Sequence, residues 1–70
     1  MEETTRRDIR RLLKTFGVQA DEALSAYLAQ NPHVERLRVR VTLEDLTDYG
    51  SSVPEGTLEL VVEDEISGGV

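Results

Sequence analysis

Residues 36–43 read RLRVRVTL, a strict alternation of polar and apolar side chains. A period of two is typical of a β-strand that has one face on an apolar core and the other in water. The apolar face would carry Leu37, Val39, Val41 and Leu43. The opposite face would carry Arg36, Arg38, Arg40 and Thr42. We therefore predict a strand over about residues 34–44.

A second strand is predicted over about residues 57–66, because apolar residues again alternate there, at Leu58, Leu60 and Val62. The segment between the strands contains DYGSS at 48–52 and PEG at 54–56, both of them compositions that favour turns. Consecutive strands of this kind form an antiparallel hairpin. The last residues, 67–70, are expected to be frayed.

Two registers of this hairpin keep its apolar rows together and set arginines against glutamates. A constant sum of paired residue numbers equal to 101 would place Arg38 opposite Glu63. A sum of 103 would place Arg40 opposite the same Glu63. The sequence does not choose between the two.

Upstream of the hairpin, the apolar spacing changes to that of an amphipathic helix. Thr5 and Asp8 match the start of a capping box, and Gly17 stands where a left-handed residue would end a helix. Between them, the i, i+3, i+4, i+7 pattern is filled by Ile9, Leu12, Leu13 and Phe16. The pattern predicts a helix over about residues 5–16.

A second helix is predicted over about residues 20–30, ended by Asn31-Pro32 because proline disfavours the α conformation of the residue before it. Its apolar stripe would be formed by Ala20, Ala23, Leu24, Tyr27 and Leu28. The fold class expected is α+β. Two N-terminal helices would pack on one face of a C-terminal antiparallel hairpin (ααββ), in a single small domain over residues 1–70.

A chain of 70 residues buries only about 60% of the surface that it exposes when unfolded. Small domains therefore usually need additional stabilisation from disulfides, a metal or a partner subunit. The chain has no cysteine, which excludes disulfides and thiolate metal sites, and its one histidine, His33, leaves no zinc set. Oligomerisation is the remaining option, and pairing of two hairpins across a twofold axis would give a four-stranded sheet with fewer open edges. A homodimer is therefore expected, with a lean monomer as the alternative.

Charge is distributed unevenly along the chain. Residues 1–40 hold eight basic and six acidic side chains, a net +2, and residues 41–70 hold eight acidic ones and no basic one, a net −8. The eight cations are Arg6, Arg7, Arg10, Arg11, Lys14, Arg36, Arg38 and Arg40. We interpret the strand arginines first as half of a charge-matched sheet face. There are two alternatives. The arginines could form a surface that docks a second copy or a partner, or a surface that binds nucleic acid.

The segment around Gly17 resembles a helix-turn-helix over about 20 residues, with the hairpin in the place of a wing. That resemblance would imply DNA binding through the start of the second helix. Asp21 and Glu22 stand there, the third helix of such domains is missing, and the net charge of −6 opposes DNA affinity.

No catalytic, cofactor, metal or small-molecule site is indicated, and no apolar run is long enough to span a membrane. The protein is expected to be cytoplasmic. The predicted function is that of a small acidic, non-enzymatic interaction or accessory protein that binds another protein, through the eight cations and Tyr49 of the loop. The alternative is a nucleic-acid-associated regulator that uses the basic first helix and the arginine strand.

Overall fold

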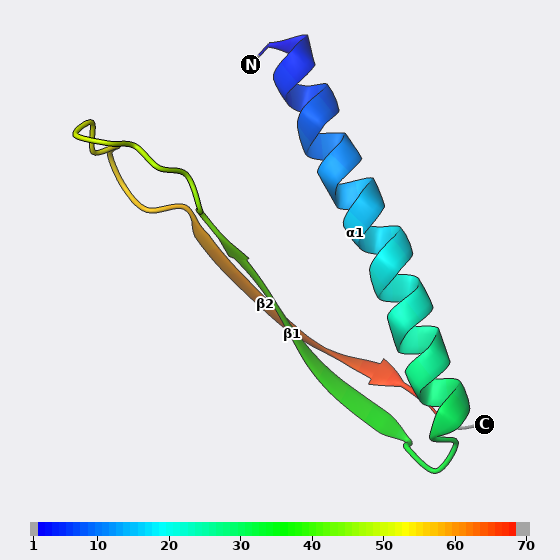
Figure 1. Cartoon of the computed structure of the whole chain (residues 1–70). Helices are drawn as coiled ribbons and strands as arrows, with labels where there is room; N and C mark the ends of the chain where they lie inside the picture. The colour runs from blue at the N-terminus through cyan, green and yellow to red at the C-terminus, as the bar shows by residue number, and fades with distance from the viewer. Residues whose placement is uncertain (1, 69–70) are drawn as a thin grey trace.

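The computed structural model describes residues 2–68 and has the element order helix, strand, strand (Figure 1). Helix α1 spans Glu3–Gln30, strand β1 spans Arg36–Glu44 and strand β2 spans Glu59–Ser67. The α+β class is confirmed. The described range contains a single helix, however, so the prediction of two helices is wrong, and so is the helix-turn-helix that depended on it.

Helix α1 passes through Gly17 without interruption. Positive φ angles occur in the described range only at Gly50 and Gly56, so Gly17 does not adopt the left-handed conformation of a helix end. A glycine inside a helix costs about 1 kcal/mol relative to alanine, which good helix formers on both sides can offset. The start also differs from the prediction, because Thr5 lies inside the helix and Glu2 at the N-cap makes no side-chain capping bond.

The C-terminal end of α1 is confirmed at Gln30. Asn31 caps it twice, because its backbone N–H donates to the Leu28 carbonyl at 3.2 Å and its Nδ2 donates to the Tyr27 carbonyl at 2.8 Å. These bonds satisfy carbonyls that the last turn leaves without a helical partner. Pro32 then prevents the helix from continuing.

Strands β1 and β2 pair antiparallel with the register sum of 103. Arg40 lies opposite Glu63 and Val41 lies opposite Val62. The same register sets Asp64 opposite Val39, so one carboxylate stands in the otherwise apolar row. An inward-facing charge of this kind discourages unwanted strand pairing.

The end of the hairpin is tied to its beginning. Ser67 is the last residue of β2, and the Gly68 N–H donates to the Glu35 carbonyl at 2.9 Å. The predicted fraying is therefore wrong for these two residues, and residues 69–70 lie outside the described range. The structure has a two-stranded sheet, and the four-stranded sheet of a dimer stays a prediction.

Helix and hairpin form a V (Figure 1). They meet at residues 31–35, which connect α1 to β1. They diverge toward the helix N-terminus and the loop that joins the strands. Half-buried apolar side chains gather at the closed end, namely Leu24, Leu28, Val34, Leu37 and Ile66. None of the side chains that the structure describes is fully buried. The molecule measures 51 × 23 × 17 Å.

Candidate interaction surface

The open end of the V exposes large apolar side chains along α1. Leu13 is 61% exposed and Phe16 is 47% exposed, although their spacing would place both in a core. The whole exposed set on this face of the helix is Ile9, Leu12, Leu13, Phe16 and Tyr27. These residues belong to the same apolar stripe as Leu24 and Leu28, which are half-buried, with Leu28 beside Gly68 at the end of the hairpin.

The hairpin offers a second exposed apolar set on the side that faces the helix. Leu37 at the start of β1 is half-buried, whereas Leu60 and Val62 in β2 are 55% and 50% exposed. Because strand side chains alternate, the residues that share the face of Leu37 beyond the junction are Val41, Leu43, Leu60 and Val62. We call these four residues, together with the helix set above, the open apolar face.

The opposite side of the hairpin sets its three arginines near glutamates, although its last pair places Glu44 opposite Glu59. Arg40 holds the Glu63 carboxylate, with Nη2 at 2.8 Å and Nε at 3.1 Å from the same oxygen. Arg36 reaches Glu65 at 3.8 Å, diagonally across the strands. Arg38 stands opposite Glu65. All of these side chains are exposed, so each pair stabilises the hairpin by well under 1 kcal/mol after solvent screening.

One hollow on the hairpin has a volume of about 410 Å³ and is lined by Arg38, Val39, Arg40 and Glu63. Its single carboxylate is already engaged by Arg40. The remaining lining groups are cations and an aliphatic side chain, which could attract an anion but supply no nucleophile. A hollow this open to solvent does not make an enclosed site.

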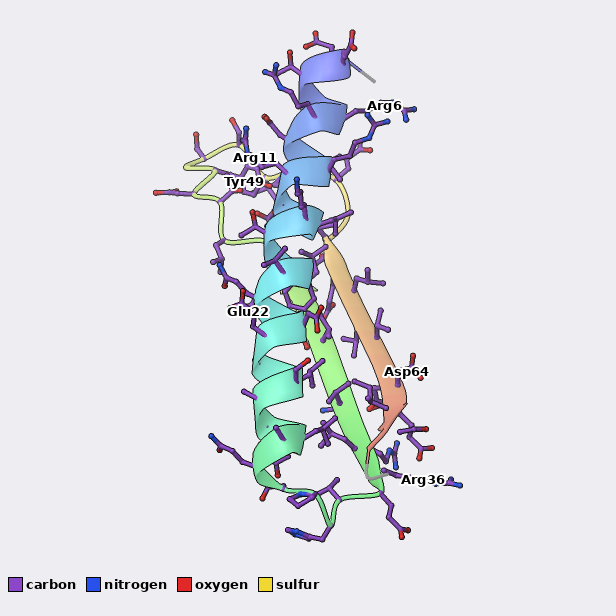
Figure 2. All side chains as sticks on the ribbon, turned by 90° about the vertical axis from the view of Figure 1, so that its right-hand side faces the viewer. Arg6, Arg11, Glu22, Arg36, Tyr49 and Asp64 are labelled. Atoms are coloured by element: carbon purple, nitrogen blue, oxygen red, sulfur yellow. The ribbon has the colours of Figure 1, made fainter. Side chains whose placement is uncertain are left out.

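The helix cations lie away from the strand cations. Arg6 and Arg11 project into solvent near the start of α1, whereas Arg36 lies at the opposite, closed end of the molecule (Figure 2). Within the helix block, Arg11 pairs with Asp8 at 3.1 Å. The two predicted basic groups, Arg6 to Lys14 and Arg36 to Arg40, are therefore not brought together into one continuous surface.

Tyr49 is engaged within its own loop. Its hydroxyl donates to Asp45, whose other oxygen accepts from the Thr47 N–H at 2.9 Å. The bond from Tyr49, followed by those from Thr47, lowers the pKa of Asp45, and the Asp45 carboxylate raises the pKa of Tyr49 above its ordinary value of 10.0. Asp48 and the positive φ of Gly50 shape the adjoining turn, where the Gly50 N–H donates to Asp48.

Two negative findings apply to residues 2–68. No group of three or more His, Cys, Asp and Glu side chains is placed to hold a metal ion. The single helix of this range is not apolar enough over its length to cross a membrane.

Comparison of the chain with protein-family models, with curated proteins and with solved structures gives no match. The candidate interaction surface is therefore argued from the geometry of this chain alone. The sequence pattern predicted an interaction site at the cations and Tyr49, and a core along the apolar stripe. The stripe itself was visible in the spacing, but its exposure follows from the fact that residues 2–68 form no second helix that would cover it.

Proposed function

We propose that this protein is a small non-enzymatic interaction or accessory protein whose open apolar face binds another polypeptide. The observation that carries the proposal is the exposed area. The chain exposes 6623 Å². A compact monomer of 7.8 kDa would expose about 4,400 Å². The excess of about 2,200 Å² has to be covered for the fold to gain the stability of an ordinary domain.

Size and shape lead to the same conclusion. The radius of gyration is 16.7 Å, compared with about 11 Å for a compact chain of this length. Contiguous apolar patches larger than a few hundred Å² are rare on soluble monomers and mark interaction sites. The chemistry of the face supports a protein partner, since Phe16 and Tyr27 are aromatic anchors of the kind that dominate binding energy.

The alternative function, association with nucleic acid, is favoured by one observation. Arg6 and Arg11 extend into solvent from the start of α1 (Figure 2), on the part of the helix that also holds Arg7, Arg10 and Lys14. The net charge of −6 and the glutamates beside the strand arginines weigh against it. Titration with mixed DNA at low salt distinguishes the two, because phosphate contacts would give an affinity that falls steeply as salt is raised.

Site-specific photo-cross-linking tests the main proposal. A benzophenone side chain is placed at Phe16 on the open apolar face, or at Val18 as the matched control. Val18 is exposed on the same helix, but it lies about 200° around from Phe16, at 100° per residue. We expect adducts with a polypeptide from position 16, in the purified protein or in an extract of its source, and far fewer from position 18. Equal yields from both positions, or none from either, would contradict the proposal.

A further inference from the structure

We infer that the polypeptide covering the open apolar face is a second copy of this chain, paired through α1 in antiparallel orientation about a twofold axis level with Val18. The inference rests on the proposed function and names its partner. Its starting point is the spacing along the helix. Steps of four and three residues alternate through Ile9, Leu13, Phe16, Ala20, Ala23 and Tyr27. That is the seam of a two-helix coiled coil.

The sizes of the seam residues select the orientation. Around the middle of the seam, Leu13 and Phe16 are large and Ala20 and Ala23 are small, while Ile9 and Tyr27 at its two ends are both large. In an antiparallel pair with a residue sum of 36, Phe16 packs on Ala20, Leu13 on Ala23 and Ile9 on Tyr27. Every layer then contains at least one large side chain. A parallel pair would set Phe16 on Phe16 and Ala20 on Ala20, leaving crowded layers beside underfilled ones, which cost stability.

The ends of the seam agree with the same register. Continuing the alternation outward reaches Arg6 at one end and Gln30 at the other, both polar. Their numbers also sum to 36, so the antiparallel pair places these two polar residues together at each edge of the apolar contact. Polar residues at the borders limit an interface to a defined length.

Charge favours antiparallel pairing as well. The first half of α1 holds all five helix cations against Glu3 and Asp8, a net +3, and the second half holds Asp21 and Glu22 with no cation, a net −2. Antiparallel pairing sets the basic half of one copy along the acidic half of the other. Parallel pairing would set five cations alongside five, which is unfavourable at the contact.

The shape of the monomer leaves room for this partner. Antiparallel pairing brings the second half of the partner helix to the open end of the V, the end toward which α1 and the hairpin diverge (Figure 1). On the helix, Leu24 and Leu28 are half-buried, Leu28 beside Gly68, and the neighbouring side of the stripe is left for the partner. The hairpin residues of the open apolar face can then pack against the apolar side of the partner helix.

The area agrees with an obligate homodimer. Such interfaces bury roughly 2,000–5,000 Å² in total, or about 1,000–2,500 Å² per chain. The excess of about 2,200 Å² on each chain falls within that range. A twofold contact uses the same face on both copies, so one interface covers both chains at once.

Disulfide trapping tests the arrangement in the full chain, which has no cysteine of its own. Leu13→Cys and Ala23→Cys are made separately and mixed after each has been refolded alone. Antiparallel pairing puts positions 13 and 23 of different copies opposite each other, while two copies of position 13 lie about 15 Å apart along the axis. A disulfide needs Cα atoms within about 7 Å. We expect at least tenfold more cross-linked dimer from the mixture than from either variant alone.

Sedimentation of the wild type supplies a second measurement that does not depend on the variants. A dimer whose population falls on dilution, together with cross-linking of the mixture, supports the inference. Self-linking of each single variant would overturn the antiparallel arrangement. A wild type that sediments as a 7.8 kDa monomer at all concentrations would overturn the second copy. In that case, photo-cross-linking from Phe16 to a different polypeptide would leave the proposed function standing, whereas no adduct would remove both.

Discussion

The carboxylate of Asp45 organises the start of the loop between the strands, because it accepts bonds from both Tyr49 and Thr47. These bonds lower the pKa of Asp45 below its ordinary value of 3.8, so their contribution is fully present above that pH and is lost as pH falls through the folded-state pKa. The pKa of Tyr49 is raised above 10.0, so its contribution is present below that pH and is lost as pH rises through the folded-state pKa. The loop contact is therefore expected to persist from about pH 4 to pH 10.

Asp45→Asn should lower the pKa of Tyr49 toward 10.0, since it weakens the hydrogen bond that holds the phenol protonated and also removes the nearby negative charge. Ultraviolet titration of tyrosinate measures this in a Tyr27→Phe background, where Tyr49 is the one remaining tyrosine. Asp48→Asn is the matched control, because it removes an equal charge from a residue that bonds Gly50 and not the phenol. Equal shifts in both variants would show that the effect is general charge and not the Asp45 contact.

Gly68 closes the junction between helix and hairpin, and it has no room for a side chain. A Cβ added there would lie 2.7 Å from the Val34 carbonyl oxygen and 2.8 Å from a Leu28 methyl. Because the carbonyl is backbone, it cannot move aside cheaply, and overpacking of this kind costs about 1–3 kcal/mol. Gly68→Ala should therefore lower the free energy of unfolding by about that amount in urea titration. Ser67→Ala, at an exposed neighbour, should change it by less than about 0.5 kcal/mol.

At the level of elements, the hairpin could be predicted from sequence and the single helix could not. Strict alternation over residues 36–43 leaves one interpretation, because a shift by one residue would turn the apolar row to solvent. The choice between sums of 101 and 103 shifts the pairing by two residues and keeps both rows, so the pattern alone could not decide it. In the helix, a glycine such as Gly17 is compatible both with a helix end and with a helix interior, so its presence alone does not distinguish the two. The surrounding turns decide which one forms.

Gly17→Ala tests the continuity of α1 by the sign of its effect. In a continuous helix, with nothing within 4 Å of the added Cβ, alanine should stabilise the fold by about 0.5–1 kcal/mol. If Gly17 instead had the left-handed conformation of a helix end, alanine would destabilise it by a similar amount. Urea unfolding followed by far-UV circular dichroism measures the difference.

The register of the hairpin is testable through the pair of Arg40 and Glu63, whose charged atoms lie 2.8 Å apart. A double-mutant cycle with Arg40→Ala and Glu63→Ala should give a coupling of about 0.2–1 kcal/mol. The cycle of Arg38→Ala and Glu63→Ala is the control, since the 101 register would pair those two residues. A larger coupling for Arg38 than for Arg40 would mean that the strands are shifted by two residues.

At the scale of the whole molecule, the sequence predicted that 70 residues without cysteine would need a partner. The open V leaves apolar side chains of both the helix and the hairpin exposed, where a partner could cover them. Apolar residues counted as core in the sequence, Leu13 and Phe16 among them, are exposed because one continuous helix cannot fold back on the hairpin over its whole length. A break at Gly17 would have allowed the two halves to cover each other. Because α1 does not turn at Gly17, residues 2–68 do not form a closed core.

If a second polypeptide chain completes the fold, stability must depend on concentration, because association is coupled to folding. For a homodimer of this size, a tenfold increase in protein should raise the thermal midpoint by roughly 3–6 °C. Leu13→Asp should abolish this dependence and lower the helix content, since it places a charge in the contact. Val18→Asp introduces the same charge on the opposite side of α1 and should preserve the dependence.

Circular dichroism of the three proteins over about a hundredfold range of concentration measures both effects. A wild-type midpoint that stays constant would show that the V is stable alone. Loss of the dependence in the Val18 variant as well would show that the helix contact is not confined to the open apolar face. Retention in the Leu13 variant would place the association elsewhere, with the charged side of the hairpin as the remaining surface. The Leu13 and Val18 pair therefore decides which face of one helix the second chain covers.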